Sequence, residues 1–123
     1  MGISNTPGDQ GSYNEDNELQ TNQDDNLNYV GVDYGSSQTN TTIITPSAGK
    51  KLEIHSIVLS SSATTGVSVI EFLTSGGLAY KFYHTSQSRG SSGIIHLDGN
   101  IDEVLSISCP ANTFIGVVYH EHS

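Results

Sequence analysis

The sequence predicts an all-β domain built as a jelly-roll-like antiparallel β-sandwich. Residues 41–120 consist of short runs rich in Ser, Thr, Val, Ile and Tyr, residue types that suit half-buried strands. These runs recur roughly every ten residues, and none shows the 3.6-residue apolar period of a helix. Clusters of Gly, Pro, Asn, Asp and Ser separate them, as turns require. A plain Greek-key sandwich is the alternative architecture.

The first four predicted strands are each closed by turn residues. TTIIT ends at Pro46, which cannot donate to a sheet ladder, and LEIHSIVLS is followed by the polar stretch SSATTG. VSVIEFLT ends at the tight turn SGG, and LAYKFYHT is followed by the loop SQSRGSSG. The four predicted strands occupy residues 41–45, 52–60, 67–74 and 78–85.

Three further strands complete the prediction. GIIHL ends at the DGN turn, EVLSIS ends before PAN, and TFIGVVYH runs almost to the end of the sequence. They occupy residues 93–97, 103–108 and 113–120. Cys109 has no second cysteine to pair with, so we expect it to be a small side chain of the core.

The apolar pattern changes phase within two of these runs. In 52–60 the apolar positions shift from Ile54 to Ile57, and in 67–74 they shift from Val69 to Ile70. Either these strands are buried on both faces, or a β-bulge bends them as at the corner of a sandwich. Residues 78–85 alternate, which places on one face Leu78, Tyr80, Phe82 and His84.

The first 39 residues differ from the rest in both charge and apolar content. Residues 1–39 contain seven carboxylates and no Lys or Arg, whereas residues 40–123 carry a net charge of only −2. Just nine apolar side chains lie in the first segment, against 33 in the second. We therefore expect an acidic, flexible and largely irregular N-terminal arm at 1–39 and a β-sandwich domain at 40–123.

The acidic composition also excludes some classes of partner. A net charge of −9 with four basic residues disfavours nucleic acid and anionic membrane surfaces, because phosphate neutralisation supplies most of that affinity. No apolar run is long enough for a membrane helix, and no signal-peptide pattern opens the sequence. We expect synthesis in the cytoplasm.

Two stretches resemble a group of small tailed-phage virion proteins. They are AGKKLEIHSIVLSSSATTGVSVIEFLTSGG at 48–77 and LDGNIDEVLSISCPANTFIGVVYH at 97–120. The resemblance implies a jelly-roll decoration (cement) protein, often trimeric, on the surface of a phage capsid, with the major capsid protein as partner. Some similar proteins are tail or fibre components. The matching positions are fold-bearing and imply no site: Gly49, Lys50, Lys51, Leu59, Ser60, Leu105, Gly116 and Tyr119.

One strand-like segment, 29–34, lies within the acidic arm. On a strand, Val30, Val32 and Tyr34 would point one way and Tyr29 the other. Such a segment can add to the edge of a neighbouring sheet, so these four residues are the predicted partner-binding positions. The segment forms a strand either only against a partner subunit, or in cis as the first strand of the same domain. Both alternatives stay open at this point.

A body of this size gains from burying an edge or a face against a partner. We therefore expect a homo-oligomer, a trimer according to the resemblance, or assembly onto a larger particle. The alternative function is a carbohydrate- or receptor-binding module. Tyr80, Tyr83 and Tyr119 could supply aromatic platforms for a sugar, but Tyr80 and Tyr83 fall on opposite faces of their strand.

The sequence predicts no enzyme activity, no cofactor and no metal. It contains no G-x-S-x-G elbow and no Gly-rich phosphate-binding motif. The alternative for metal is the pair His120 and His122, which would face the same way on a strand; we prefer two solvated histidines near a chain end. His55, His84 and His96 occur singly in separate strands, and the sequence does not show whether they cluster.

Overall fold

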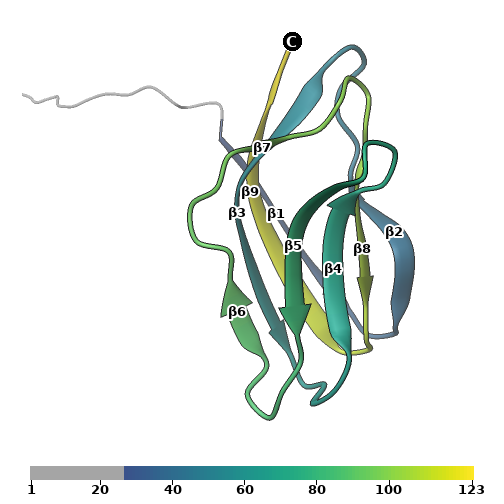
Figure 1. The fold of residues 1–123 in the computed structure, drawn as a ribbon, viewed down its shortest axis with the longest axis vertical. Coiled ribbons are helices and arrows are strands. Elements are labelled where there is room, and N and C mark those ends of the chain that lie inside the picture. The colour runs from purple at the N-terminus through teal and green to yellow at the C-terminus, as the bar shows by residue number, and fades with distance from the viewer. Residues whose placement is uncertain (1–26) are drawn as a thin grey trace, which may run out of the picture.

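The computed structural model describes residues 27–123, which form nine strands and no helix (Figure 1). Expectations about residues 1–26 lie outside the described residues. The strands are β1 (Asn28–Tyr34), β2 (Gln38–Ile44), β3 (Lys51–Ser61), β4 (Val67–Phe72), β5 (Gly77–Tyr83), β6 (Arg89–Ser91), β7 (Leu97–Asp98), β8 (Leu105–Cys109) and β9 (Thr113–His122).

The strands form two antiparallel sheets that pack face to face as a sandwich (Figure 1). One sheet has the order β1-β9-β3-β6, with β7 also paired to β3, and the other has the order β2-β8-β4-β5. The chain crosses between the sheets after β1, β2, β3, β5, β7 and β8. Eight strand positions in this order, with β6 and β7 sharing one, make a jelly roll, so the predicted fold class is confirmed.

The predicted strand at 93–97 is wrong in most of its length. Two short strands, β6 and β7, flank this segment instead, and residues 92–96 lie beside β3 without a regular ladder. The reason is local backbone geometry. Gly93 has a positive φ of 70°, which a regular strand does not accommodate, and the amides of Ser92 and Ile95 bond separately to the carbonyls of Ile57 and His55.

The phase change within 52–60 is a β-bulge, the second of the two alternatives that the sequence left open. The register of β3 against β9 shifts between Ile54 and Ser56, so His55 is the extra residue. Because of this bulge, Ile54 and Ile57 are both buried although three positions separate them.

The second phase change has a different origin. In β4 the inward residues Ser68, Ile70 and Phe72 alternate without interruption, and the irregularity lies in β5, where Ala79 is the extra residue. This bulge turns Leu78 outward, leaving it 50% exposed. The expectation that Leu78 shares a face with Tyr80, Phe82 and His84 is therefore wrong.

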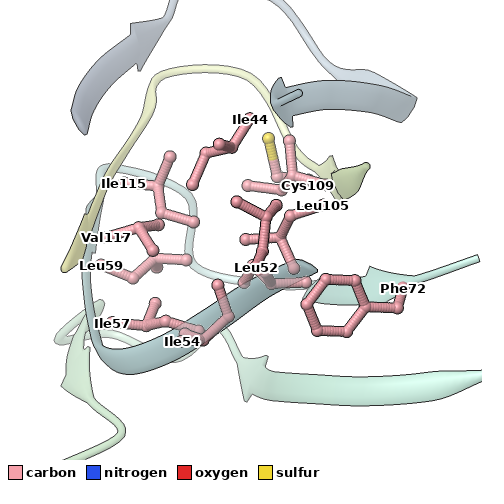
Figure 2. Packing of buried hydrophobic residues seen from close by; sticks show 12 residues of the cluster. Ile44, Leu52, Ile54, Ile57, Leu59, Phe72, Leu105, Cys109, Ile115 and Val117 are labelled. Carbon is pink, nitrogen blue, oxygen red and sulfur yellow. The ribbon is translucent and has the colours of Figure 1, made fainter. Parts of the chain in front are cut away.

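The core lies between the sheets, where side chains of both point toward one another (Figure 2). Cys109 belongs to this core, as expected, and burial raises the pKa of its thiol. The buried apolar residues are Ile44, Leu52, Ile54, Ile57, Leu59, Ile70, Phe72, Leu105, Ile107, Cys109, Ile115 and Val117.

Candidate functional site: the outer face of the β1–β9–β3 sheet

The segment predicted to bind a partner is an edge strand of the domain itself. β1 pairs with β9 over its whole length, from Asn28 opposite Tyr119 to Tyr34 opposite Thr113. The segment is therefore the first strand of the same domain and pairs in cis, which is the second of the two alternatives. The sandwich therefore includes a strand N-terminal to the boundary expected between residues 39 and 40.

The four predicted partner-binding side chains are divided between two faces. Val30, Val32 and Tyr34 are partly buried and pack against the core, and burial raises the pKa of Tyr34. Tyr29 points to the outer face and is 61% exposed. Among the four, Tyr29 is the one whose side chain is available to a partner.

Two glycines make room for the Tyr29 ring on the sheet. Gly31 and Gly116 are directly opposite each other in the β1–β9 register. A Cβ atom at Gly116 would lie 2.6 Å from the Tyr29 hydroxyl oxygen, and one at Gly31 would lie 2.9 Å from it. The ring therefore lies across the two backbones, where any larger residue would push it away.

Apolar side chains surround this ring. Val58 of β3 approaches Gly116 from one side, and Phe114 of β9 approaches Gly31 from the other. Val58 is exposed, while Phe114 and Val118 are half-buried. We call Tyr29, Val58, Phe114 and Val118 the apolar patch. Apolar side chains that lie together on one face of a sheet can serve as a contact site for another molecule.

A cluster of histidines lies farther along the same strands. His55 comes from the bulge of β3, His96 from the segment before β7, and His120 from β9. The ring centroids of His55 and His96 are 4.9 Å apart, and those of His55 and His120 are 5.6 Å apart. The three rings are therefore neighbours, although their positions in the sequence are far apart.

Glu53 lies at the centre of these rings. Its Oε2 is 2.9 Å from Nδ1 of His96, while its Oε1 is 3.5 Å from Nδ1 of His120 and 3.9 Å from Nε2 of His55. The hydrogen bond from His96, followed by attraction to the other imidazoles, holds the pKa of Glu53 below its usual range against the opposing effect of burial. We call Glu53, His55, His96 and His120 the histidine cluster.

A second acidic group extends the histidine cluster toward the C-terminus. Nε2 of His122 lies 3.3 Å from Oδ1 of Asp98, and the His120 and His122 rings are 5.5 Å apart. Two sets of side chains place their ligand atoms within 4.8 Å of one another: Glu53, His55 and His96, and Glu53, Asp98 and His122. The predicted alternative pair is divided: among the described residues His122 belongs to the second set and His120 to neither.

The fifth histidine is in the other sheet and has a different role. Nε2 of His84 is 2.7 Å from the Ser68 hydroxyl, and both side chains are buried. Burial holds the pKa of His84 below its usual range. Because both residues are buried, we interpret this Ser–His pair as a structural contact and not as a nucleophile with its base.

Sequence reasoning identified Tyr29 but missed the partners that complete this face. Gly116 was assigned to the fold alone, His55 and His96 were treated as single residues, and His120 was paired only with His122. A usable signal was the strand register: once residues 52–60 pair with 113–120, Glu53 falls opposite His120. The contribution of His96 depends on an irregular segment and had no such signal.

Comparison of the chain with family models, curated proteins and solved structures found no match. Within residues 27–123, no helix is long and apolar enough to cross a membrane.

Proposed function

We propose that this chain is a structural virion protein that binds the outer surface of a phage head as a decoration (cement) protein. It acts as a trimer, and its partner is the major capsid protein. The role is binding and reinforcement, without catalysis. Tail or fibre location and carbohydrate or receptor binding are the alternatives.

The observation that carries this proposal is the apolar patch on the outer face of β1, β9 and β3. Tyr29 is an exposed aromatic side chain that lies flat over Gly31 and Gly116. Aromatic side chains at the centre of a contact supply much of the binding energy between proteins. An exposed aromatic ring beside further apolar side chains has the composition of the central part of a protein–protein contact.

The charge of the N-terminal segment supports the same proposal. Residues 1–26 contain six carboxylates and no Lys or Arg, and they join the domain at Leu27, two residues before Tyr29. A partner that meets both this segment and the apolar patch should present basic or amide-rich surface around an apolar contact.

Stabilisation of the head follows from preferential binding to the assembled coat. A ligand that binds only the assembled state raises the free energy of disassembly by linkage. Contacts that are weak one by one become effective when three linked copies bind a repeating lattice.

The decisive experiment images particles of the phage that encodes this chain, with and without its gene. We expect regular jelly-roll densities on the head of the first particles, and heat-induced opening of the second at a lower temperature. Sedimentation of the purified chain should give about three times the 13.1 kDa of one copy.

A matched pair of variants tests whether Tyr29 contacts the phage head. Tyr29→Ala should weaken binding to particles that lack the chain by about tenfold or more, as for a central aromatic contact. Tyr83→Ala, which removes an equally exposed tyrosine from the other sheet, should leave binding unchanged. Density on the tail, or glycan binding by a chain that ignores heads, would overturn the proposal in favour of an alternative.

A further inference from the structure

We propose that Glu53, His55 and His96 form a binding site for a divalent transition-metal ion of the zinc type. This inference does not depend on the proposed function. It concerns a site that the sequence did not predict, because its ligands come from separate parts of the chain.

The geometry of the three side chains fits a shared ion. One ligand atom from each lies within 4.8 Å of the other two. Zinc–nitrogen and zinc–oxygen bonds are about 2.0–2.2 Å long, so small side-chain rotations would bring the three atoms onto one ion. The sheet already fixes Glu53 and His55 on β3, and His96 reaches them from the adjoining segment.

An unused nitrogen points to a ligand at this position. Nε2 of His55 is buried and forms no hydrogen bond within residues 27–123. It lies 3.9 Å from Oε1 of Glu53, which is too far for a hydrogen bond. The carboxylate is nevertheless its neighbour. A buried polar atom without a partner costs free energy, and an ion held between this nitrogen and the carboxylate would remove that cost.

The donor set selects the class of metal. Two imidazoles and one carboxylate are typical ligands of Zn²⁺ and other late first-row ions, whereas Mg²⁺ and Ca²⁺ prefer oxygen ligands alone. Nδ1 of His120, 3.5 Å from Oε1 of Glu53, is the nearest further donor for a fourth position. Binding through Nδ1 of His96 would replace the hydrogen bond to Glu53, and the imidazole would then carry its N–H proton on Nε2.

Such an ion would fasten the least regular part of the sheet. Residues 92–96 are attached to β3 by separate backbone bonds at Ser92 and Ile95 and by the short flanking strands. A metal bridge from His96 to Glu53 and His55 ties this segment to β3 directly. Metal binding should therefore raise the free energy of unfolding.

Isothermal titration of the chelator-treated full chain with ZnCl₂ tests the site. We expect one Zn²⁺ per chain and, with Zn²⁺ at about 100 times its dissociation constant, a Tm higher by about 10 °C or more. His96→Ala should weaken binding at least about tenfold and remove most of the rise in Tm. His96 is 64% exposed, so this variant should fold normally without metal.

His122→Ala is the matched control, because it removes a neighbouring histidine that belongs only to the second set with Glu53 and Asp98. It should keep the affinity of the unmodified chain. Absence of binding heat would overturn the proposal, as would unchanged affinity in both His55→Ala and His96→Ala. Loss of affinity in His122→Ala would also overturn it, because the ion would then use the other set.

Discussion

The two sheets are alike on their inner faces and differ on their outer faces. Both contribute fully buried aliphatic side chains to one core, such as Ile57 and Val117 from the first sheet and Ile70 and Ile107 from the second. Outside, the β1-β9-β3-β6 sheet carries the apolar patch and the histidine cluster. Within residues 27–123, the outer face of the β2-β8-β4-β5 sheet carries neither a glycine-seated aromatic ring nor a group of histidines, and it presents Leu78, Lys81 and Tyr83 beside the half-buried Val69 and Glu71.

This difference separates stability from function. Side chains on the inner faces are fixed by packing, so their chemistry is largely dictated by the fold. An exposed tyrosine over two glycines and a carboxylate among three histidines are not needed to build a sandwich. We infer that binding is concentrated on the outer face of the first sheet, and that the second sheet supports the core.

The largest expected effect is the loss of stability when a fully buried side chain is removed. It tests whether the inner faces of the two sheets contribute equally to the unfolding free energy. Phe72→Ala in β4 and Ile57→Ala in β3 should each lower the free energy of unfolding by about 4 kcal/mol, because both side chains are fully buried. Urea denaturation of the purified variants measures this. Ile94→Ala, at a side chain 86% exposed, is the control and should change little. A much smaller loss at one of the two buried positions would show that the sheets contribute unequally.

The sequence predicted the inner faces better than the outer ones. Strand periodicity is a local signal, so the sandwich, the change of phase in 52–60 and the buried Cys109 could be predicted. The bulge at Ala79 could not, because β4 and β5 pair across a turn and the extra residue has no apolar signature. The segment 93–97 was wrongly predicted as a strand because its apolar residues favour one. Nothing in the sequence indicates the positive φ of Gly93.

The candidate site was predicted only in part, for a physical reason. Tyr29 was visible because one aromatic segment stands out in an acidic stretch. The histidine cluster depends on which strands are neighbours, and neighbours in a jelly roll are far apart in sequence. Glu53 meets His120 and His96 through long-range pairing of β3 with β9 and β7.

The second effect is the loss of stability when a buried carboxylate is removed. Glu53 and Glu103 both have lowered pKa values, but their surroundings differ. Glu53 is held by histidines on the outer face, whereas Glu103 is buried and accepts hydrogen bonds from Thr74 Oγ1 and from the amides of Ser75 and Asn100. Glu103→Ala would leave these donors without their acceptor and should cost about 3 kcal/mol in urea denaturation. Glu71→Ala, on the outer face of β4, should change stability by less than about 0.5 kcal/mol.

The pH dependence of stability can be predicted from Glu103. Burial alone would raise the pKa of Glu103, but its hydrogen bonds more than offset this and hold that pKa below the usual range. A lowered pKa in the folded state means that the stabilisation is complete well above about pH 4 and is lost as the pH falls. Glu103→Gln should therefore flatten the decline in unfolding free energy between about pH 5 and pH 3. An unchanged slope would contradict this assignment.

The third effect concerns the support beneath the apolar patch. Gly116→Ala would place a Cβ 2.6 Å from the Tyr29 hydroxyl and 3.0 Å from Cγ2 of Val58, so the ring must move. We expect a loss of about 1–2 kcal/mol in unfolding free energy and weaker binding to phage heads. Gly35→Ala is the matched control, because no atom lies within 4 Å of the added Cβ. Equal behaviour of the two variants would show that the ring does not depend on this glycine.

The smallest effect belongs to the outer face of the second sheet, where Nζ of Lys81 lies 5.3 Å from the centre of the Tyr83 ring. An exposed cation–π contact contributes about 0.5 kcal/mol, so Lys81→Ala should change thermal or urea unfolding by no more than that. It should also leave binding to phage heads intact, since the proposed contact lies on the outer face of the other sheet. If removing Lys81 weakened binding as much as removing Tyr29, the second sheet would also be a contact surface. The distinction between a binding face and a supporting face would then fail.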